Sequence, residues 1–121
     1  MTQSNKILIV EDDKDFLEAL SIIFEEDFKI YLAHDGQEAW NLFYNVQPQV
    51  VVTDIVMPRM DGAILTRKIK IASPDTNIFA FSGADKIHLK NAKEAGADDV
   101  FEKPRDMMSM YRAVNKLQLT E

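Results

Sequence analysis

Five short apolar runs, rich in β-branched or aromatic residues, recur along this chain and constrain its fold more than any other feature. Each has the length of a β-strand. The first, third and fourth are close to continuously apolar, which is typical of strands covered on both faces in a parallel sheet. The sequence therefore predicts strands at Lys6–Val10, Phe28–Ala33, Gln49–Thr53, Asn77–Phe81 and Asp99–Glu102.

Segments of helical periodicity lie between these runs. The first, after Asp13, carries apolar residues at helical spacing: Phe16, Leu20, Ile23 and Phe24. Similar segments cover residues 35–48, 61–74, 85–95 and 107–117. Short connections and right-handed crossovers then lead to an α/β fold of the (βα)5 type. We expect a doubly wound, flavodoxin-like three-layer sandwich around a five-stranded parallel sheet, whose strand order this pattern does not give.

Composition limits the classes of protein that fit. The 121 residues, 46% of them apolar, suit one domain over residues 1–121. A formal charge of -6 argues against a direct nucleic-acid footprint, and the absence of Cys excludes disulfides and thiolate metal sites. The first apolar run is too short for a membrane span or a signal peptide. We expect a cytoplasmic protein without membrane contact.

Polar residues follow the predicted strands where each strand ends. Glu11, Asp12 and Asp13 follow the first strand and Asp54 the third. Ser82 follows the fourth strand and Lys103 the fifth. In open α/β sheets the functional crevice lies outside the carboxyl ends of the strands. The alternative reading of the acids is that they sit at helix N-termini, where the macrodipole favours them.

A cation would resolve the conflict between these acids. Two carboxylates about 5 Å apart repel by roughly 3 kcal/mol at an effective dielectric of about 20. Mg²⁺ suits an open site made of oxygen ligands, and Mn²⁺ is the alternative. The edge would then hold a carboxylate nucleophile, a cation, and donors from Ser82 and Lys103 for phosphoryl oxygens. Asp13 is assigned to capping the first helix rather than to the metal.

Four motifs stand in order at the predicted strand ends: ILIVEDD, DIVMPRMDG, FSGA and FEKP. With these motifs the chain resembles a receiver domain of two-component response regulators, of the single-domain, chemotaxis-regulator-like type. The resemblance implies that Asp54 accepts a phosphoryl group. It also implies that Mg²⁺ is held by the side chains of Glu11, Asp12 and Asp54 and by the backbone of Val56.

The resemblance assigns further roles around the phosphoryl group. Ser82 would be the switch hydroxyl, and Lys103 would bind a phosphoryl oxygen, aimed by a cis peptide bond before Pro104. The chain departs from the family at the aromatic switch position, which is Val100. Phe101 is one residue away and is expected on the opposite face of the strand. The aromatic switch is therefore in doubt.

The resemblance implies a signalling switch and not an enzyme acting on other molecules. Its donor would be a histidine kinase or a phosphotransfer protein, and its target a downstream protein or an output domain. Residues 85–117 hold the face through which family members dock or form homodimers. Val56 and Ala84 line the path of the hydrolytic water in the family and cannot hydrogen-bond it, so we expect slow autodephosphorylation.

Two other functions would fit part of this pattern. A Mg²⁺-dependent aspartyl phosphohydrolase would also use an acid at a strand end, but it would need a second acid two residues later, where this chain has Val56. A pseudo-receiver that binds partners without being phosphorylated fits Val100 but leaves Asp12, Asp54 and Lys103 unexplained.

Overall fold

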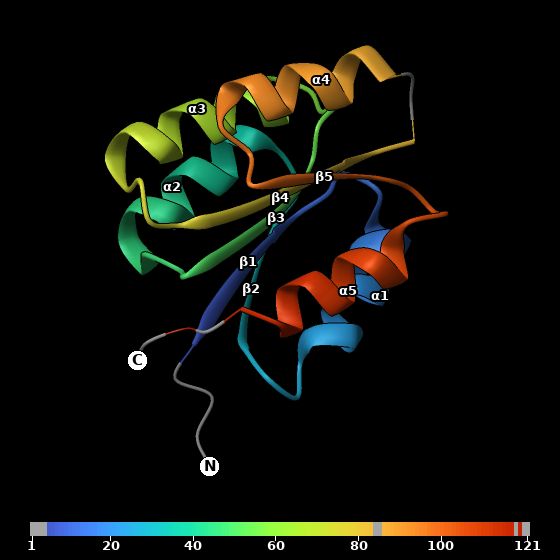
Figure 1. The fold of residues 1–121 in the computed structure, drawn as a ribbon. Helices are drawn as coiled ribbons and strands as arrows, with labels where there is room; N and C mark the ends of the chain where they lie inside the picture. The colour runs from blue at the N-terminus through green and yellow to red at the C-terminus, as the bar shows by residue number, and fades with distance from the viewer. Residues whose placement is uncertain (1–4, 84–85, 118, 120–121) are drawn as a thin grey trace.

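The computed structural model describes residues 5–83, 86–117 and 119 (Figure 1). Its strands are β1 (Lys6–Val10), β2 (Lys29–Ala33), β3 (Val50–Asp54), β4 (Asn77–Ser82) and β5 (Asp99–Glu102). Its helices are α1 (Lys14–Phe24), α2 (Gly36–Val46), α3 (Gly62–Ala72), α4 (Lys86–Ala95) and α5 (Met107–Asn115). The predicted (βα)5 succession is confirmed. Position 85, where we expected the fourth helix to begin, is outside the described residues.

All five strands are parallel, in the order β2-β1-β3-β4-β5. The chain starts near the middle of the sheet, adds β2 on one side, and then winds in the other direction through β3, β4 and β5. The three inner strands, β1, β3 and β4, are buried almost throughout, whereas β2 and β5 are partly exposed. The continuously apolar runs are therefore the inner strands, as a sheet covered on both faces requires.

Helices cover both faces of the sheet (Figure 1). On one face, α1 and α5 pack over a core that includes Ile7, Val52 and Phe81. On the other face, α2, α3 and α4 cover alternate strand residues such as Leu8 and Val51. The alternation follows from the period of two along a strand. None of the helices in the described part of the chain has the length and apolarity that crossing a bilayer requires.

The buried stripe of α1 differs in part from the apolar spacing noted in the sequence. Ile23 is 37% exposed, whereas Leu17, which that spacing did not include, is buried. Leu17, Leu20 and Phe24 are spaced three and four residues apart and are buried together. The apolar pattern of this helix allows two neighbouring phases, and contact with the sheet selects the one that includes Leu17.

Aspartates cap three of the helices at the carboxyl edge of the sheet. The side chains of Asp13, Asp35 and Asp61 accept hydrogen bonds from backbone N–H groups in the first turns of α1, α2 and α3. The predicted capping role of Asp13 is confirmed. These caps make the connections around the strand ends short and well defined.

Candidate functional site

Three carboxylates meet at the carboxyl edge of the sheet. Glu11 and Asp12 follow β1, and Asp54 ends β3, which pairs directly with β1. One carboxylate oxygen of each residue lies within 4.8 Å of those of the other two. Glu11 and Asp54 are buried, whereas Asp12 is exposed, so the cluster opens to solvent beside Asp12. The fold thus brings together the three carboxylates that the sequence predicted to share one site.

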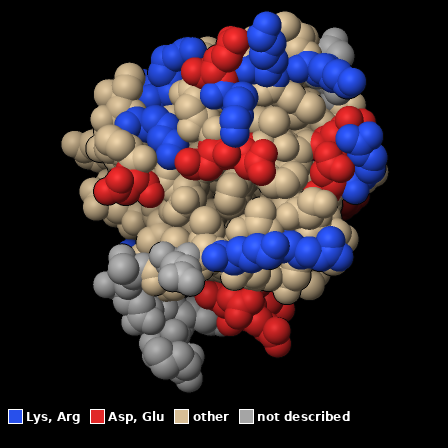
Figure 2. All heavy atoms as spheres, viewed as in Figure 1, with Lys and Arg blue, Asp and Glu red and all other residues tan. Residues whose placement is uncertain are grey.

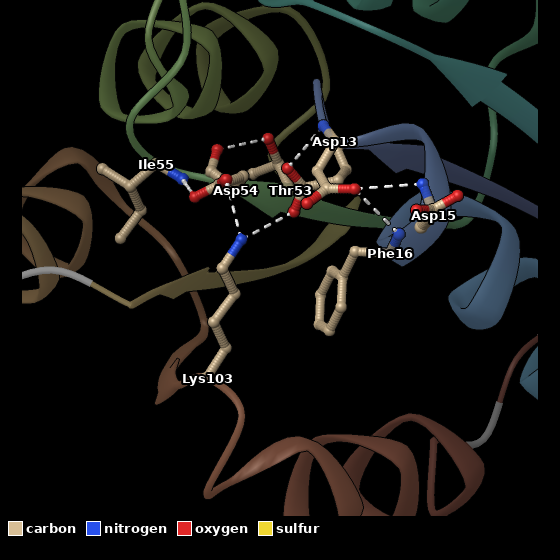
Figure 3. Close-up of polar contacts among 8 residues, drawn as sticks. Asp13, Asp15, Phe16, Thr53, Asp54, Ile55 and Lys103 are labelled. Atoms are coloured by element: carbon tan, nitrogen blue, oxygen red, sulfur yellow. Dashed lines mark hydrogen bonds and ion pairs between the residues drawn. The ribbon is translucent and has the colours of Figure 1, made fainter.

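Lys103 reaches this cluster from the end of β5. Its Nζ lies 2.9 Å from Oε1 of Glu11 and 3.3 Å from Oδ2 of Asp54 (Figure 3). Its backbone N–H donates to the carbonyl oxygen of Ser82 at 3.0 Å. The peptide bond between Lys103 and Pro104 is cis, as expected. One ammonium group therefore bridges acids that come from two different strands.

Asp54 is held by its neighbours along the chain. Its Oδ1 accepts a hydrogen bond from the N–H of Ile55 at 2.7 Å, and its carbonyl oxygen accepts one from the Thr53 hydroxyl at 2.8 Å (Figure 3). A Cβ atom at Gly62 would clash with the Asp54 carbonyl oxygen, so α3 can begin this close only because residue 62 has no side chain. The carboxylate is therefore held at Oδ1 by the Ile55 N–H, and its Oδ2 faces Lys103.

Burial sets the electrostatics of Glu11. Its relative exposure is 1%. Burial raises the pKa of Glu11 to about 7, against the lowering effects of the Asp13 N–H and the Lys103 ammonium. Burial also lowers the pKa of Lys103, but the hydrogen bond to Glu11 and the charge of Asp54 outweigh it, and the net shift is upward. Lys103 is therefore a cation in this site, and its charge does not fully offset the effect of burial on the pKa of Glu11.

The connection between β3 and α3 is tied to the start of α2. Arg59, in the left-handed region with φ of 68°, donates to Oδ2 of Asp35 from Nη2 at 2.7 Å and from Nε at 3.2 Å. The pKa of Asp35 is lowered mainly by the Glu38 N–H and further by Arg59. This connection carries Val56, which is 49% exposed. Val56 therefore lies two residues after Asp54, on an exposed part of a connection that Arg59 ties to Asp35.

The switch positions lie on β4 and β5. Ser82 ends β4 and is buried. Val100 packs on the α4 side of the sheet against a cluster that includes Ala80 and Ala92. Phe101 packs on the opposite side, with its ring edge-to-face on Phe79 at 5.9 Å between centroids. The expected opposite orientation of residues 100 and 101 is confirmed, and Phe101 therefore does not stand in for an aromatic residue at position 100.

The donor set fits a hard divalent cation. The three acids offer only oxygen ligands, which Mg²⁺ and Mn²⁺ prefer. In the described part of the chain, the ion pairs recorded for these acids are both with Lys103, which supplies one positive charge to the group. Glu11, Asp12 and Asp54 are therefore the residues that would hold the ion.

The comparisons with known proteins agree with this site. The model of the response regulator receiver domain matches residues 7–115. The chain belongs to that family. This receiver domain is 35% identical over 115 residues to the response regulator MprA of Mycobacterium sp. strain KMS, covering 90% of the chain and 50% of that protein. It therefore spans about half the length of the curated relatives that it matches.

Solved receiver domains share its fold. One, from a DNA binding response regulator of Colwellia psychrerythraea 34H, has a TM-score of 0.85 and 29% identity, over 93% of this receiver domain and 97% of that chain. Another, in a CheX-CheY-BeF3-Mg complex from Borrelia burgdorferi, has a TM-score of 0.81 and 26% identity, over 94% and 90% of the two chains. The family and the fold imply two-component signalling.

The sequence did not single out two contacts near the acids. Phe16 lies with its ring under the Lys103 ammonium, at 4.7 Å from the centroid, although its helical spacing marks it only as a core residue. The Asp35–Arg59 pair joins two connections that are distant in sequence. Arg59 stands in the run between Asp54 and Gly62, and nothing in the local sequence marks it as the partner of Asp35.

Proposed function

We propose that this receiver domain is a phosphorylatable switch in which Asp54 accepts a phosphoryl group from the phosphohistidine of a histidine kinase or phosphotransfer protein. The observation that supports this most is the position of Lys103 Nζ, 3.3 Å from Oδ2 of the buried Asp54 and 2.9 Å from Oε1 of Glu11. The Borrelia burgdorferi CheY named above was solved with BeF3 and Mg, which supports the same chemistry here.

The transfer is a displacement at phosphorus. An oxygen of the Asp54 carboxylate forms the new P–O bond, and the P–N bond to histidine breaks with its electron pair going to the imidazole nitrogen. In this proposal Lys103 and Ser82 donate hydrogen bonds to the phosphoryl oxygens; Lys103 Nζ lies 3.3 Å from Oδ2 of Asp54, and Ser82 ends the neighbouring strand β4. Glu11, Asp12 and Asp54 would hold Mg²⁺, which when bound would neutralise charge on the phosphoryl group.

Hydrolysis ends the signal. A water molecule attacks phosphorus, the P–O bond to Asp54 breaks, and inorganic phosphate leaves. Val56, two residues after Asp54, is half-exposed and has no side-chain group that could orient this water. Ala84, the other position on the expected water path, is outside the described residues. We expect slow autodephosphorylation, with a lifetime of minutes or longer; a lifetime of seconds contradicts this part of the proposal.

The partners follow from the chemistry. Receiver domains of response regulators interact with histidine kinases and with output or partner proteins. For this chain, the face of α4, β5 and α5 is the proposed docking surface for a downstream protein or an output domain, or for a second copy. Neither direct nucleic-acid binding nor membrane contact is part of the proposal.

The test is incubation with Mg²⁺ and acetyl phosphate, followed by intact mass spectrometry. We expect a single adduct of about 80 Da in the wild-type protein. Asp54→Asn must abolish it, and Lys103→Met should slow its formation by about 100-fold or more. Asp75→Asn, which removes an exposed acid in the connection before β4, is the matched control and must leave it unchanged. Absence of any adduct on the wild type overturns the proposal and leaves the pseudo-receiver reading.

A further inference from the structure

We propose that Phe16 is a positioning residue for Lys103: its ring, together with that of Phe81, fixes the lysine ammonium where it meets the phosphoryl group. This inference rests on the proposed function of Asp54 for its effect on rate. The contact itself is visible in the structure without any phosphoryl group (Figure 3).

Two aromatic rings lie beneath the ammonium. Lys103 Nζ is 4.7 Å from the ring centroid of Phe16 and 5.5 Å from that of Phe81. The two rings contact one another, with centroids 5.8 Å apart and planes tilted by 58°. Phe81 is fully buried and Phe16 is half-buried. The ammonium therefore sits between a floor of rings and the two carboxylates of Glu11 and Asp54.

The position of Phe16 is itself fixed by the acidic cluster. Oε2 of Glu11 accepts a hydrogen bond from the N–H of Asp13 at 3.0 Å, and Oδ1 of Asp13 accepts one from the N–H of Phe16 at 3.2 Å. The Phe16 ring then contacts Lys103, whose Nζ donates back to Oε1 of Glu11 at 2.9 Å. These four contacts lead from Glu11 through Asp13, Phe16 and Lys103 back to Glu11. The Phe16 ring and the lysine are therefore positioned by the same carboxylate.

The rings supply an attraction that a leucine of similar bulk would lack. The negative face of an aromatic ring attracts an ammonium ion, and more strongly where water is excluded. A lysine side chain has four flexible carbons and three N–H donors. Ring faces can restrain it while its N–H groups stay available for carboxylate and phosphoryl oxygens. The rings therefore restrict the conformations of the Lys103 side chain before the phosphoryl group is transferred.

The simpler account is that Phe16 only fills the core of α1. Its helical spacing fits that account, and Phe16 does pack against the main hydrophobic cluster. The two accounts differ in what a substitution changes. A core role predicts lost stability alone, whereas a positioning role predicts a loss of phosphorylation rate that depends on the presence of Lys103.

The experiment compares Phe16→Leu, Phe16→Tyr and a matched control, Phe28→Leu, which alters another core phenylalanine that packs on Phe24. Phosphorylation rates are measured by intact mass with acetyl phosphate at saturating Mg²⁺. We expect Phe16→Leu to lower the phosphorylation rate by about 3- to 10-fold. Phe16→Tyr should retain most of the wild-type rate, and Phe28→Leu should leave the rate unchanged. In a Lys103→Met background, Phe16→Leu should have no further effect on the rate.

A second measurement does not depend on phosphorylation. In NMR spectra of the ¹³C-lysine-labelled protein, ring currents should move the ε-methylene protons of Lys103 upfield of those of the other lysines, with Lys103→Arg giving the assignment. Phe16→Leu should remove most of this shift. The inference is overturned if the shift is absent, or if Phe16→Leu slows phosphorylation equally with and without Lys103. A normal NMR result with no phosphorylation of the wild type contradicts the proposed function alone.

Discussion

Glu11 combines more of the features of the site than any other residue discussed above. It is buried, contacts the Lys103 ammonium and the Asp13 N–H, and lies in the group of acids that would hold Mg²⁺. Burial raises its pKa to about 7 from a usual value of 4.5. A carboxyl group in this position changes its charge in the neutral pH range and stays fully ionised there only if a cation compensates for its burial.

The metal-free protein should therefore lose stability as the pH rises. Between pH 4.5 and about 7 the folded state holds a proton on Glu11 that the unfolded state has released, so the contribution of this group falls as the pH increases. From pH 5 to pH 8 the loss should reach up to about 3 kcal/mol. Urea unfolding in EDTA at both pH values measures it, with Glu11→Gln as the comparison.

Glu11→Gln removes the titrating group and keeps its shape, so its free energy of unfolding should change less over this interval. Subtracting one profile from the other cancels the titration of groups that both proteins share. Equal pH dependence in the two proteins would show that Glu11 is ionised throughout.

The sequence predicted which polar residues come together better than it predicted their individual contacts. Glu11, Asp54 and Lys103 were recognisable because acids and a lysine at strand ends converge in any parallel sheet. The contact between Lys103 and Phe16 was not recognisable. Phe16 has the helical spacing of a core residue, and its half-exposed place over an ammonium depends on tertiary structure. Glu11 and Lys103 are 92 positions apart in the sequence, although their side chains are in direct contact.

At the scale of elements, the connection from β3 to α3 is the one that holds Asp54, the proposed nucleophile. The N–H of Gly62, at the start of α3, donates to the Ile55 carbonyl at 2.7 Å, and the helix begins against the backbone of residues 54 and 55. Within the connection, Arg59 is paired with Asp35. Pro58 and Gly62 are residues typical of a turn, but Arg59 gave no local sign of its ion pair.

Gly62→Ala should disturb both the fold and the site. The added Cβ would lie 2.8 Å from the Ile55 Cα and would clash with the Asp54 carbonyl, so α3 must move away. We expect a loss of about 2 kcal/mol in stability, as for other overpacked positions, and slower phosphorylation of Asp54. Urea unfolding and the acetyl phosphate assay measure the two effects.

Gly83→Ala is the matched control for the Gly62 substitution. Its Cβ would meet the Lys103 side chain at 3.4 Å, an ordinary contact, so its free energy of unfolding should change by less than about 0.5 kcal/mol. If the two alanine variants are equally stable, the close approach of α3 to β3 does not constrain residue 62.

For the whole molecule, charge is spread over the surface while the acids of the site are collected at one edge. On the face shown in Figure 2, Lys and Arg side chains alternate with Asp and Glu. The order of the strands in the sheet was not predictable. Continuously apolar runs mark the inner strands but do not show which strand lies next to which. β1, β3 and β4 were correctly inner, and the sequence β2-β1-β3-β4-β5 came from the structure.

Mg²⁺ should stabilise the whole domain, because its ligands come together only in the folded chain. At ten times the dissociation constant, the gain in unfolding free energy is about 1.4 kcal/mol. This corresponds to a rise of about 5 °C in the thermal midpoint for a domain of this size. Thermal unfolding at constant ionic strength measures it. Asp12→Asn should lose most of the rise and Asp75→Asn none of it, and an unchanged wild-type midpoint at every magnesium concentration would contradict the metal site.

The inner strands β1 and β3 carry Glu11, Asp12 and Asp54 at their ends, and both strands are covered by helices on each face. Segments of that kind are the last to exchange their amide hydrogens, since they open only with the domain as a whole. The acids of the proposed site therefore follow the strands that we expect to open most slowly. Local opening at the ends of the chain should leave these acids in place, and heat or denaturant should disperse them only when the whole domain unfolds.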